Sequence, residues 1–310
     1  MFEDNTSVLS EKKISCIINP NAANKKWKRR KFLRKYLHEN LPGQIIDSHK
    51  DKAYTIQTAN KLSLDHDIIV AAGGDGTIID VIQGITECGR KKDIALGIIP
   101  LGSGNAFRKS LGIPKNVKKS IKLIAEGNTR EIDLINIEGK AATFASIGAT
   151  AQATLVSHRN NVPGFFGYFL VSRIMLIYRS KELEIELVDG IDDSGKHFDE
   201  KIFKLKVFDC IIGKTNYFGY SWKIAPKAKI DDGFIDITFF ETTALKYLFC
   251  FPLIYLGIFQ KTQKHFKAKK MILRGKNMPV QYNGEALGIK DEIELKVLPR
   301  ALKIIVPMKK

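Results

Sequence analysis

The sequence has few cysteines and no apolar stretch long enough to cross a bilayer. The longest apolar run, Tyr247 to Gln260, is shorter than the ~20 residues that a transmembrane helix needs, and Pro252 interrupts it. Residues 1–13 carry charges of both signs and no apolar segment, so we expect no secretory signal and a cytoplasmic protein. The cysteines are widely spaced and form no CxxC pair, which argues against a disulfide framework or a cysteine-based metal site; they are Cys16, Cys88, Cys210 and Cys250.

Acidic residues are outnumbered by basic ones, 33 to 50, and the formal net charge is +17. Such a balance favours anionic partners, namely nucleic acid, a phosphorylated ligand or an anionic membrane surface. We find no nucleic-acid-binding motif with interleaved aromatic residues, so nucleic acid is not expected. The length of 310 residues and a hydrophobic content of 44% indicate a folded protein with two domains.

The first third of the chain alternates between fully apolar strands and helical patterns. This alternation predicts a parallel sheet covered by helices on both faces. The expected strands are 14–19, 44–47, 67–72 and 95–100, and the expected helices are 25–40, 53–64 and 77–88.

After about Arg130 the pattern changes to short strands, which predicts an antiparallel β domain. Turn signals occur at Asp189-Gly190, Asp232-Gly233 and Asn283-Gly284. Helical inserts are expected near 163–179 and 242–260. The expected strands are 131–137, 142–146, 183–188, 203–212, 234–240, 271–274, 279–282 and 292–297. No flexible linker separates the two parts, so we expect the domains to pack tightly, with the ligand site in the cleft between them.

Gly73-Gly74-Asp75-Gly76-Thr77 follows an apolar strand and opens a helix. Glycines at such a turn let the backbone approach a ligand, and the amides at the helix start then face an anion. The carboxylate of Asp75 fits this loop if it accepts the proton of an attacking hydroxyl or helps to hold Mg²⁺. A plain turn with Asp75 as a helix cap is the alternative interpretation.

Two further loops follow neighbouring strands and should emerge at the same edge of the sheet. One is Pro100-Leu101-Gly102-Ser103-Gly104-Asn105-Ala106-Phe107, a second glycine loop. The other runs from Ile18 to Lys26 and contains Asn19. It leads into a basic segment, residues 25–35, most of whose lysines and arginines fit a solvated helix face equally well. Lys25 and Lys26, nearest the loop, are the better candidates for phosphate binding.

In this order, the three loops resemble the diacylglycerol kinase catalytic domain superfamily, which includes bacterial soluble lipid kinases, sphingosine kinases and ceramide kinases. Further similar stretches extend the resemblance over nearly the whole chain; they are 130–134, 144–148, 224–236 and 282–285. The resemblance implies an α/β nucleotide domain shaped like those of NAD kinases and phosphofructokinases, residues 1–133 with a return of 298–310. It also implies a β-sandwich lipid-binding domain, residues 134–297.

The activity implied is transfer of the γ-phosphate of ATP, with Mg²⁺, to a hydroxyl of a membrane lipid such as diacylglycerol, a sphingoid base or ceramide. Asp75 would be the general base or its close partner. Glu285 would reach the same site from the second domain, and Asp133 would lie at the lipid and metal end of that site. A structural Mg²⁺ would be held by the Asp232 carboxylate with the carbonyls of Lys229 and Phe234. The residues expected at the ATP are Asn19, Lys25, Gly73, Gly74, Gly76, Thr77, Gly102, Ser103, Gly104 and Asn105.

The sequence also departs from the family pattern, and these departures leave the acceptor lipid open. Ala106 stands where bacterial diacylglycerol kinases have an aspartate, Thr150 lies in a GATA stretch in place of GFDA, and Asn283 replaces the aspartate of a DGE stretch. A lysine, Lys214, follows Gly213 where the family has GN.

A lipid kinase must reach a membrane, so we expect peripheral association. The apolar stretches 163–178 and 247–259, each flanked by basic residues, are candidates for the contact, and two core helices are the alternative. Related lipid kinases often dimerise, so a homodimer is also implied. Two other functions stay open: an NAD kinase, which shares the GGDGT motif, and a catalytically silent protein that binds anionic membranes.

Overall fold

The computed structural model describes residues 12–22, 26–88, 93–160, 173–219 and 222–308. The chain forms two compact units. Unit 1 contains residues up to Ile132 together with Gly219 and Arg300 onward, and unit 2 contains Asp133–Phe218 and Trp222–Pro299.

Unit 1 is built on a parallel sheet of order β4-β3-β1-β2, comprising β1 (Ile14–Ile18), β2 (Gln44–Asp47), β3 (Ile68–Gly73) and β4 (Ala95–Pro100). The last part of β13 (Glu285–Ile305) lies beside β4 and runs parallel to it. Strands β1, β3 and β4 are buried along their whole length. They are apolar except for Ser15 of β1, which is paired with His66 at 2.9 Å, as expected for a parallel sheet with both faces covered.

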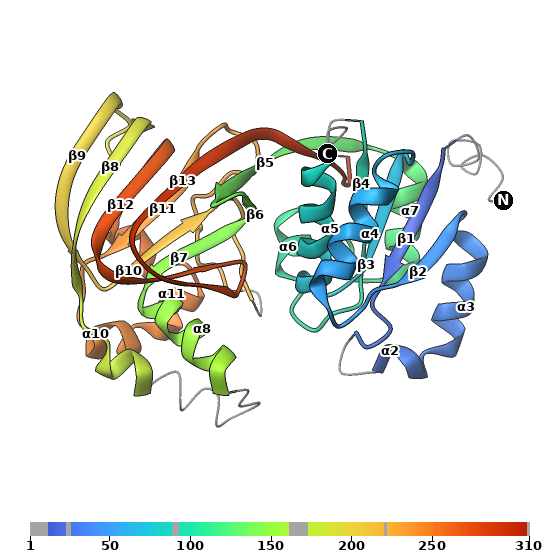
Figure 1. Ribbon diagram of the computed structural model, residues 1–310, viewed down its shortest axis with the longest axis horizontal. Coiled ribbons are helices and arrows are strands. Elements are labelled where there is room, and N and C mark those ends of the chain that lie inside the picture. The colour runs from blue at the N-terminus through green and yellow to red at the C-terminus, as the bar shows by residue number, and fades with distance from the viewer. Residues whose placement is uncertain (1–11, 23–25, 89–92, 161–172, 220–221, 309–310) are drawn as a thin grey trace. The chain divides into compact units, whose positions relative to one another are not determined.

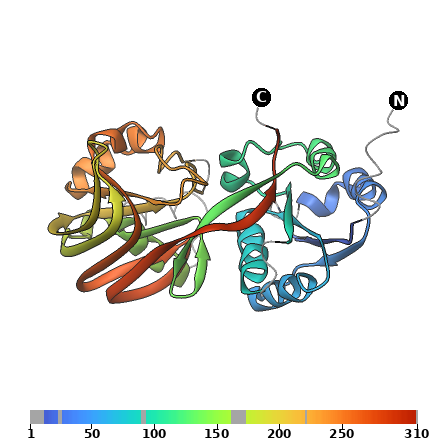
Figure 2. The ribbon, with the colours of Figure 1, turned by 90° about the horizontal axis from the view of Figure 1, so that it is seen from above.

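Helices cover both faces of this sheet (Figure 2). On one face α4 (Lys52–Leu62) packs against α5 (Asp75–Glu87), and on the other α3 (Lys31–Asn40) packs against α7 (Val117–Glu126). Two shorter helices, α2 (Lys26–Arg29) and α6 (Ala106–Ser110), complete the unit. The loops that carry the sequence motifs follow β1, β3 and β4, at the carboxyl edge of the sheet (Figure 1).

Unit 2 is antiparallel (Figure 1). Its strands are β5 (Thr129–Ile137), β6 (Lys140–Ala142), β7 (Phe144–Gly148), β8 (Lys181–Ile191), β9 (His197–Val207), β10 (Asp209–Gly213), β11 (Ile235–Phe240), β12 (Lys264–Tyr282) and most of β13. One buried apolar cluster fills the space between the strands, and includes Ile237, Leu273 and Leu295. A second cluster lies beneath α8 (Ala149–Asn160), α10 (Ala244–Phe249) and α11 (Phe251–Tyr255), where Phe240, Tyr247 and Ile254 meet. The observed architecture is the expected α/β unit with an antiparallel β-sandwich unit.

Several local predictions for unit 2 were wrong. Asp189-Gly190 is not a turn, because both residues lie inside β8, where Gly190 pairs with Phe198 on one side and Ala268 on the other. The segments 271–274 and 279–282 belong to one strand, β12, with an irregularity between Arg274 and Met278. Helix α8 was not predicted. Of the helical insert expected near 163–179, residues 161–172 lie outside the described residues, and 173–177 are helical.

Candidate functional site

The two glycine loops of unit 1 bind each other directly. The carbonyl of Gly73, the last residue of β3, accepts hydrogen bonds from the amides of Leu101 (2.8 Å) and Gly102 (3.2 Å). A Cβ atom on Gly102 would lie 2.5 Å from the Cα of Gly74, a distance that no real side chain tolerates. These loops therefore need glycine to lie this close together.

Asp75, the first residue of α5, connects the first glycine loop to the helix that follows the second. Its two carboxylate oxygens accept hydrogen bonds from the amides of Ala106 and Phe107, each at 3.1 Å. Burial raises the pKa of Asp75 above its usual value, although the same amides and the charge of Arg108 act in the opposite direction. The aspartate caps α6, and not α5 as the alternative interpretation had it. A carboxylate oxygen has a second lone pair, so this role still leaves it able to accept a proton.

Arg108 is a residue that the sequence reasoning did not identify. It lies on α6, donates to the carbonyl of Ile113 at 2.7 Å, and contributes a positive charge at Asp75. Its Nε is buried and has no hydrogen-bond partner within the described residues. Only its position shortly after the second glycine loop could have indicated this role.

The first loop, after β1, joins the same edge through Asn19. Its Nδ2 donates to the hydroxyl of Thr77 at 3.2 Å, and its backbone amide donates to the carbonyl of Ala72 at 2.8 Å. In the second glycine loop, the Nδ2 of Asn105 donates to the Gly102 carbonyl. The Asn105 Oδ1 is buried and has no partner in the part of the chain that the structure describes. Such an unpaired acceptor is costly unless water or a ligand donates to it.

The residues of unit 1 expected at the ATP thus gather at one sheet edge. Gly76 and Ser103 are exposed, Gly74 and Gly104 are half-buried, and a Cβ on Gly76 would meet nothing within 4 Å. Lys25 lies outside the described residues. Backbone amides at the start of α5 and an open surface beside Gly76 are features suited to phosphate.

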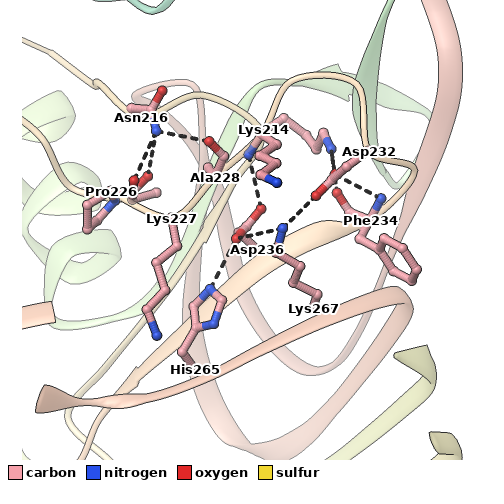
Figure 3. Close-up of polar contacts among 12 residues, drawn as sticks. Lys214, Asn216, Pro226, Lys227, Ala228, Asp232, Phe234, Asp236, His265 and Lys267 are labelled. Atoms are coloured by element: carbon pink, nitrogen blue, oxygen red, sulfur yellow. Dashed lines mark hydrogen bonds and ion pairs between the residues drawn. The ribbon is translucent and has the colours of Figure 1, made fainter. Parts of the chain in front are cut away.

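In unit 2, three of the expected site residues, Asp133, Asp232 and Phe234, meet around a lysine. Figure 3 labels the last two together with that lysine, Lys214. Lys214 is 1% exposed, and its Nζ lies 3.1 Å from Asp133 Oδ2 and 2.9 Å from Asp232 Oδ1 and donates to the Phe234 carbonyl. Lys229, expected as a third metal ligand, donates its backbone amide to Asp236 at 3.4 Å. The oxygens of Asp232 and Phe234 assigned to a structural Mg²⁺ therefore bind an ammonium group, and they do not fit a divalent ion at that position.

Glu285 lies in unit 2 at the start of β13, after the Asn283-Gly284 turn. Both turn residues have positive φ (49° and 87°), which confirms the hairpin turn predicted for an Asn-Gly pair. Asn283 Oδ1 accepts from the amides of Thr143 (3.0 Å) and Phe144 (3.3 Å), and its Nδ2 donates to the Ala141 carbonyl. An ionised aspartate could not make the last bond, which gives a structural reason for asparagine here.

A second departure from the family pattern, Thr150, is also explained by the structure. Its amide (3.2 Å) and hydroxyl donate to Asp209, which also accepts from the hydroxyl of Tyr247 at 2.9 Å. Asp209 is fully buried, and burial raises its pKa to about 7 despite these hydrogen bonds.

We expect Asp209 to make the protein less stable as the pH rises. Its pKa is raised in the folded state, so its contribution is fully present below the unfolded value of 3.8 and is lost as the pH approaches about 7. The loss is about 4 kcal/mol at most. The free energy of unfolding, measured with urea, should fall as the pH rises between these two values. In Asp209→Asn this dependence on pH should be weaker. Asp199→Asn, at an exposed strand position, is the matched control; a variant at 209 that follows the wild type contradicts the assignment.

A cavity of about 580 Å³ lies near this network in unit 2. Val156, Ile174 and Ile177 provide apolar walls, while Arg179 and Lys181 provide positive charge. Tyr178 also lines the cavity, and its ring packs edge-on against Phe208. The volume is within the range of small-ligand pockets, and the lining suits an amphipathic molecule.

Comparison with known proteins decides the family. Residues 13–137 match the profile of the diacylglycerol kinase catalytic domain, and residues 144–306 match that of the YegS C-terminal NAD kinase beta sandwich-like domain. The chain belongs to the diacylglycerol kinase catalytic domain superfamily. This is a family of phosphotransferases with an alcohol group as acceptor, so the recognition made from the sequence motifs is confirmed.

Individual members of the superfamily are similar over most of their length. A diacylglycerol kinase of Staphylococcus saprophyticus is 29% identical over 258 residues, covering 78% of this chain and 80% of the relative. One from Staphylococcus aureus is 27% identical, covering 76% and 72%. The crystal structure of a diacylglycerol kinase from Bacillus anthracis has a TM-score of 0.71 and 21% identity, covering 96% of this chain and 98% of that one. The structural likeness confirms the fold.

Within the described residues, no group of three or more histidine, cysteine, aspartate or glutamate side chains is placed to hold a metal ion. In the same part of the chain, no helix is long and apolar enough to span a bilayer.

Proposed function

We propose that this protein is an ATP-dependent lipid kinase that transfers the γ-phosphate of ATP to a hydroxyl group of a membrane lipid. The observation that carries the proposal is the joined pair of glycine loops with Asp75 between them, in a chain whose two halves match the two domains of the family. Diacylglycerol is the acceptor we favour, because it is the one in the names of the curated relatives.

In this proposal the loops of unit 1 bind the nucleotide. The amides at the start of α5 face the phosphates, and the open space beside Gly76 lets a phosphate approach the backbone. Asn19, Thr77 and Asn105 fix the shape of the loops through the hydrogen bonds described above. Mg²⁺ bound with the ATP would neutralise charge on the transferred phosphoryl group, held mainly by phosphate and water oxygens.

Asp75 would accept the proton of the lipid hydroxyl as that oxygen attacks the γ-phosphorus. Its raised pKa makes it a stronger base than an exposed carboxylate. The amides of Ala106 and Phe107 hold the carboxylate in one orientation, so it needs no rearrangement before the reaction. Glu285 stays a proposed second acidic residue of the site. Asp133 is 2% exposed and bound to Lys214, which fits a positioning role.

For the acceptor we propose the cavity near α8, with the acyl chains against Val156, Ile174 and Ile177. The acceptor itself is tested by incubating the protein with γ-labelled Mg-ATP and vesicles of diacylglycerol, sphingosine or ceramide, and separately with NAD. Label on one lipid class supports the proposal and identifies the substrate. Label on NAD would establish the NAD kinase instead. The absence of label, with vesicle binding retained, would indicate the catalytically silent membrane binder.

We further propose that α10 and α11 dock on the membrane. Tyr247 and Ile254 on these helices are buried in the core of unit 2, but their outer face is also apolar. Phe249 is 87% exposed and Leu245 73% exposed. Leu253 on α11, and Leu256 and Ile258 just after it, are also exposed apolar residues. Lys246 and Lys261 add positive charge. An exposed apolar face beside lysines suits an anionic bilayer.

Phe249→Glu should weaken binding to anionic vesicles about 10-fold, because it removes a large apolar side chain from the docking face and adds a repelled charge. Sedimentation with phosphatidylglycerol vesicles measures the effect. Leu64→Glu, at a residue 60% exposed in unit 1, is the matched control and should bind as the wild type does. Equal loss in both variants, or no loss at Phe249, would refute docking through α10 and α11.

A further inference from the structure

Lys214 follows β10 and buries its ammonium group among acidic side chains (Figure 3). Its Nζ lies 3.1 Å from Asp133 Oδ2 and 2.9 Å from Asp232 Oδ1, and it donates to the carbonyl of Phe234. An ammonium group has three donors, and here three acceptors surround it. Each donor of the Lys214 ammonium therefore has an acceptor, and the side chain is only 1% exposed.

The backbone around Lys214 is held by the same acids. The amide of Gly233 donates to Asp133 Oδ2 at 2.7 Å, and that of Phe234 donates to Asp232 Oδ1 at 3.3 Å. The amide of Asp133 donates to the Ile230 carbonyl at 2.7 Å. Lys214 thus stands at the centre of the contacts that join β5 to the loop 230–234.

A second lysine also pairs with Asp232. Lys267, on β12, lies 2.5 Å from Asp232 Oδ2 and 3.9 Å from Asp236 Oδ1, and His265 Nε2 lies 3.0 Å from the same Asp236 oxygen. Each oxygen of Asp232 therefore faces one ammonium group. Burial opposes ionisation of Asp232, but the hydrogen bonds from Lys267 and Lys214 outweigh it and lower its pKa.

A divalent cation does not fit beside these groups. Mg²⁺ requires oxygen ligands at about 2.0–2.1 Å in octahedral geometry and usually retains several waters. Lys214 Nζ already lies within hydrogen-bonding distance of the oxygens of Asp232 and Phe234 that the family resemblance assigns to that ion. An ion on the same oxygens would meet the ammonium at close range and be repelled by it.

We propose that the ammonium of Lys214 replaces a divalent metal ion at this site, so that the β unit keeps its 230–234 loop without metal. The chain itself supplies the positive charge that a metal ion taken up from solution would otherwise provide. The fold of this protein should consequently be insensitive to removal of divalent ions.

The test measures thermal unfolding of nucleotide-free protein, in EDTA and in millimolar MgCl₂ balanced for ionic strength with NaCl. We expect the wild type to unfold at one temperature in both. Lys214→Asn removes the ammonium group that Asp133 and Asp232 share, and Asp232 keeps only Lys267. Asparagine is the residue that the family pattern has here. We expect the Tm of this variant to fall by about 10 °C in EDTA and to rise by about 5 °C when Mg²⁺ is added.

The matched control is Lys270→Asn, at a half-buried lysine that pairs with Glu294 at 2.9 Å on the sheet. It should show no response to Mg²⁺. A wild type whose Tm rises with Mg²⁺, or a Lys214→Asn variant that unfolds at the same temperature in EDTA and in Mg²⁺, would overturn the proposal.

A second measurement needs only the wild type, in case Lys214→Asn does not fold. Mn²⁺ added to nucleotide-free protein is followed by its electron paramagnetic resonance signal. We expect the signal of free Mn²⁺ throughout the micromolar range; a stoichiometric site in that range that disappears in Asp232→Asn would overturn the proposal. Neither measurement depends on phosphate transfer, so both outcomes are independent of the proposed kinase activity.

Discussion

Asp75→Asn is expected to lower kcat for phosphate transfer about 1,000-fold while leaving the fold intact. Loss of a general base costs a factor of this order. Asparagine keeps one acceptor oxygen for the amides of Ala106 and Phe107, so the link between the loops is partly retained. The decisive comparison is between kcat, measured at saturating Mg-ATP, and the urea-unfolding free energy of the same variant.

The alternative is that Asp75 only caps α6. That role predicts a loss of about 1 kcal/mol in stability and little change in kcat. Asn116→Ala supplies the matched control, because Asn116 caps α7 through the Lys119 amide at 3.2 Å and lies outside the glycine loops. If Asp75→Asn behaves as Asn116→Ala does, with reduced stability and retained turnover, Asp75 is a structural residue and the proposed chemistry is wrong.

Gly76→Ala is expected to change stability and nucleotide binding in opposite directions. Gly76 is exposed in the first turn of α5, and an added Cβ would meet nothing within 4 Å. Alanine in place of a helical glycine stabilises a fold by about 0.5–1 kcal/mol. If a phosphate lies against this loop, however, the methyl group takes the space of the ligand, and the KM for ATP should rise at least ~10-fold.

Gly102→Ala is the informative comparison for Gly76→Ala. Its Cβ would lie 2.5 Å from the Gly74 Cα, so the variant should lose both stability and ATP binding. Fluorescence titration with a nucleotide analogue, together with thermal unfolding, gives both quantities. A Gly76→Ala protein with unchanged KM for ATP would show that phosphate does not bind at this turn.

The sequence predicted the parallel sheet closely because β1, β3 and β4 are almost entirely apolar and end at glycines or polar turns. Strands β2 and β4 have the predicted boundaries, 44–47 and 95–100. The antiparallel unit was harder, because pairing between distant strands overrides local turn signals. Asp189-Gly190 and Asn283-Gly284 carry the same signal, yet only the second is a turn. The first is held inside β8 by partners on both sides.

The candidate site could likewise be predicted only in part, because its contacts join residues that are distant in the sequence. The motif around Asp75 was visible in the sequence, but its contacts with the amides of Ala106 and Phe107 depend on the alignment of β3 with β4. Lys214 was seen only as a departure from the family pattern. Its role needed the positions of Asp133 and Asp232, which come from distant strands and loops, so no local pattern could have indicated it.

The central claim is that a lipid hydroxyl receives the γ-phosphate of ATP. Parallel reactions with ATP labelled at the α- or the γ-phosphate, in vesicles containing diacylglycerol, test it most directly when followed by extraction into organic solvent. We expect label in the lipid phase from γ-labelled ATP alone, in an amount equal to the ADP formed. ATP consumption with no label in the lipid phase would contradict it.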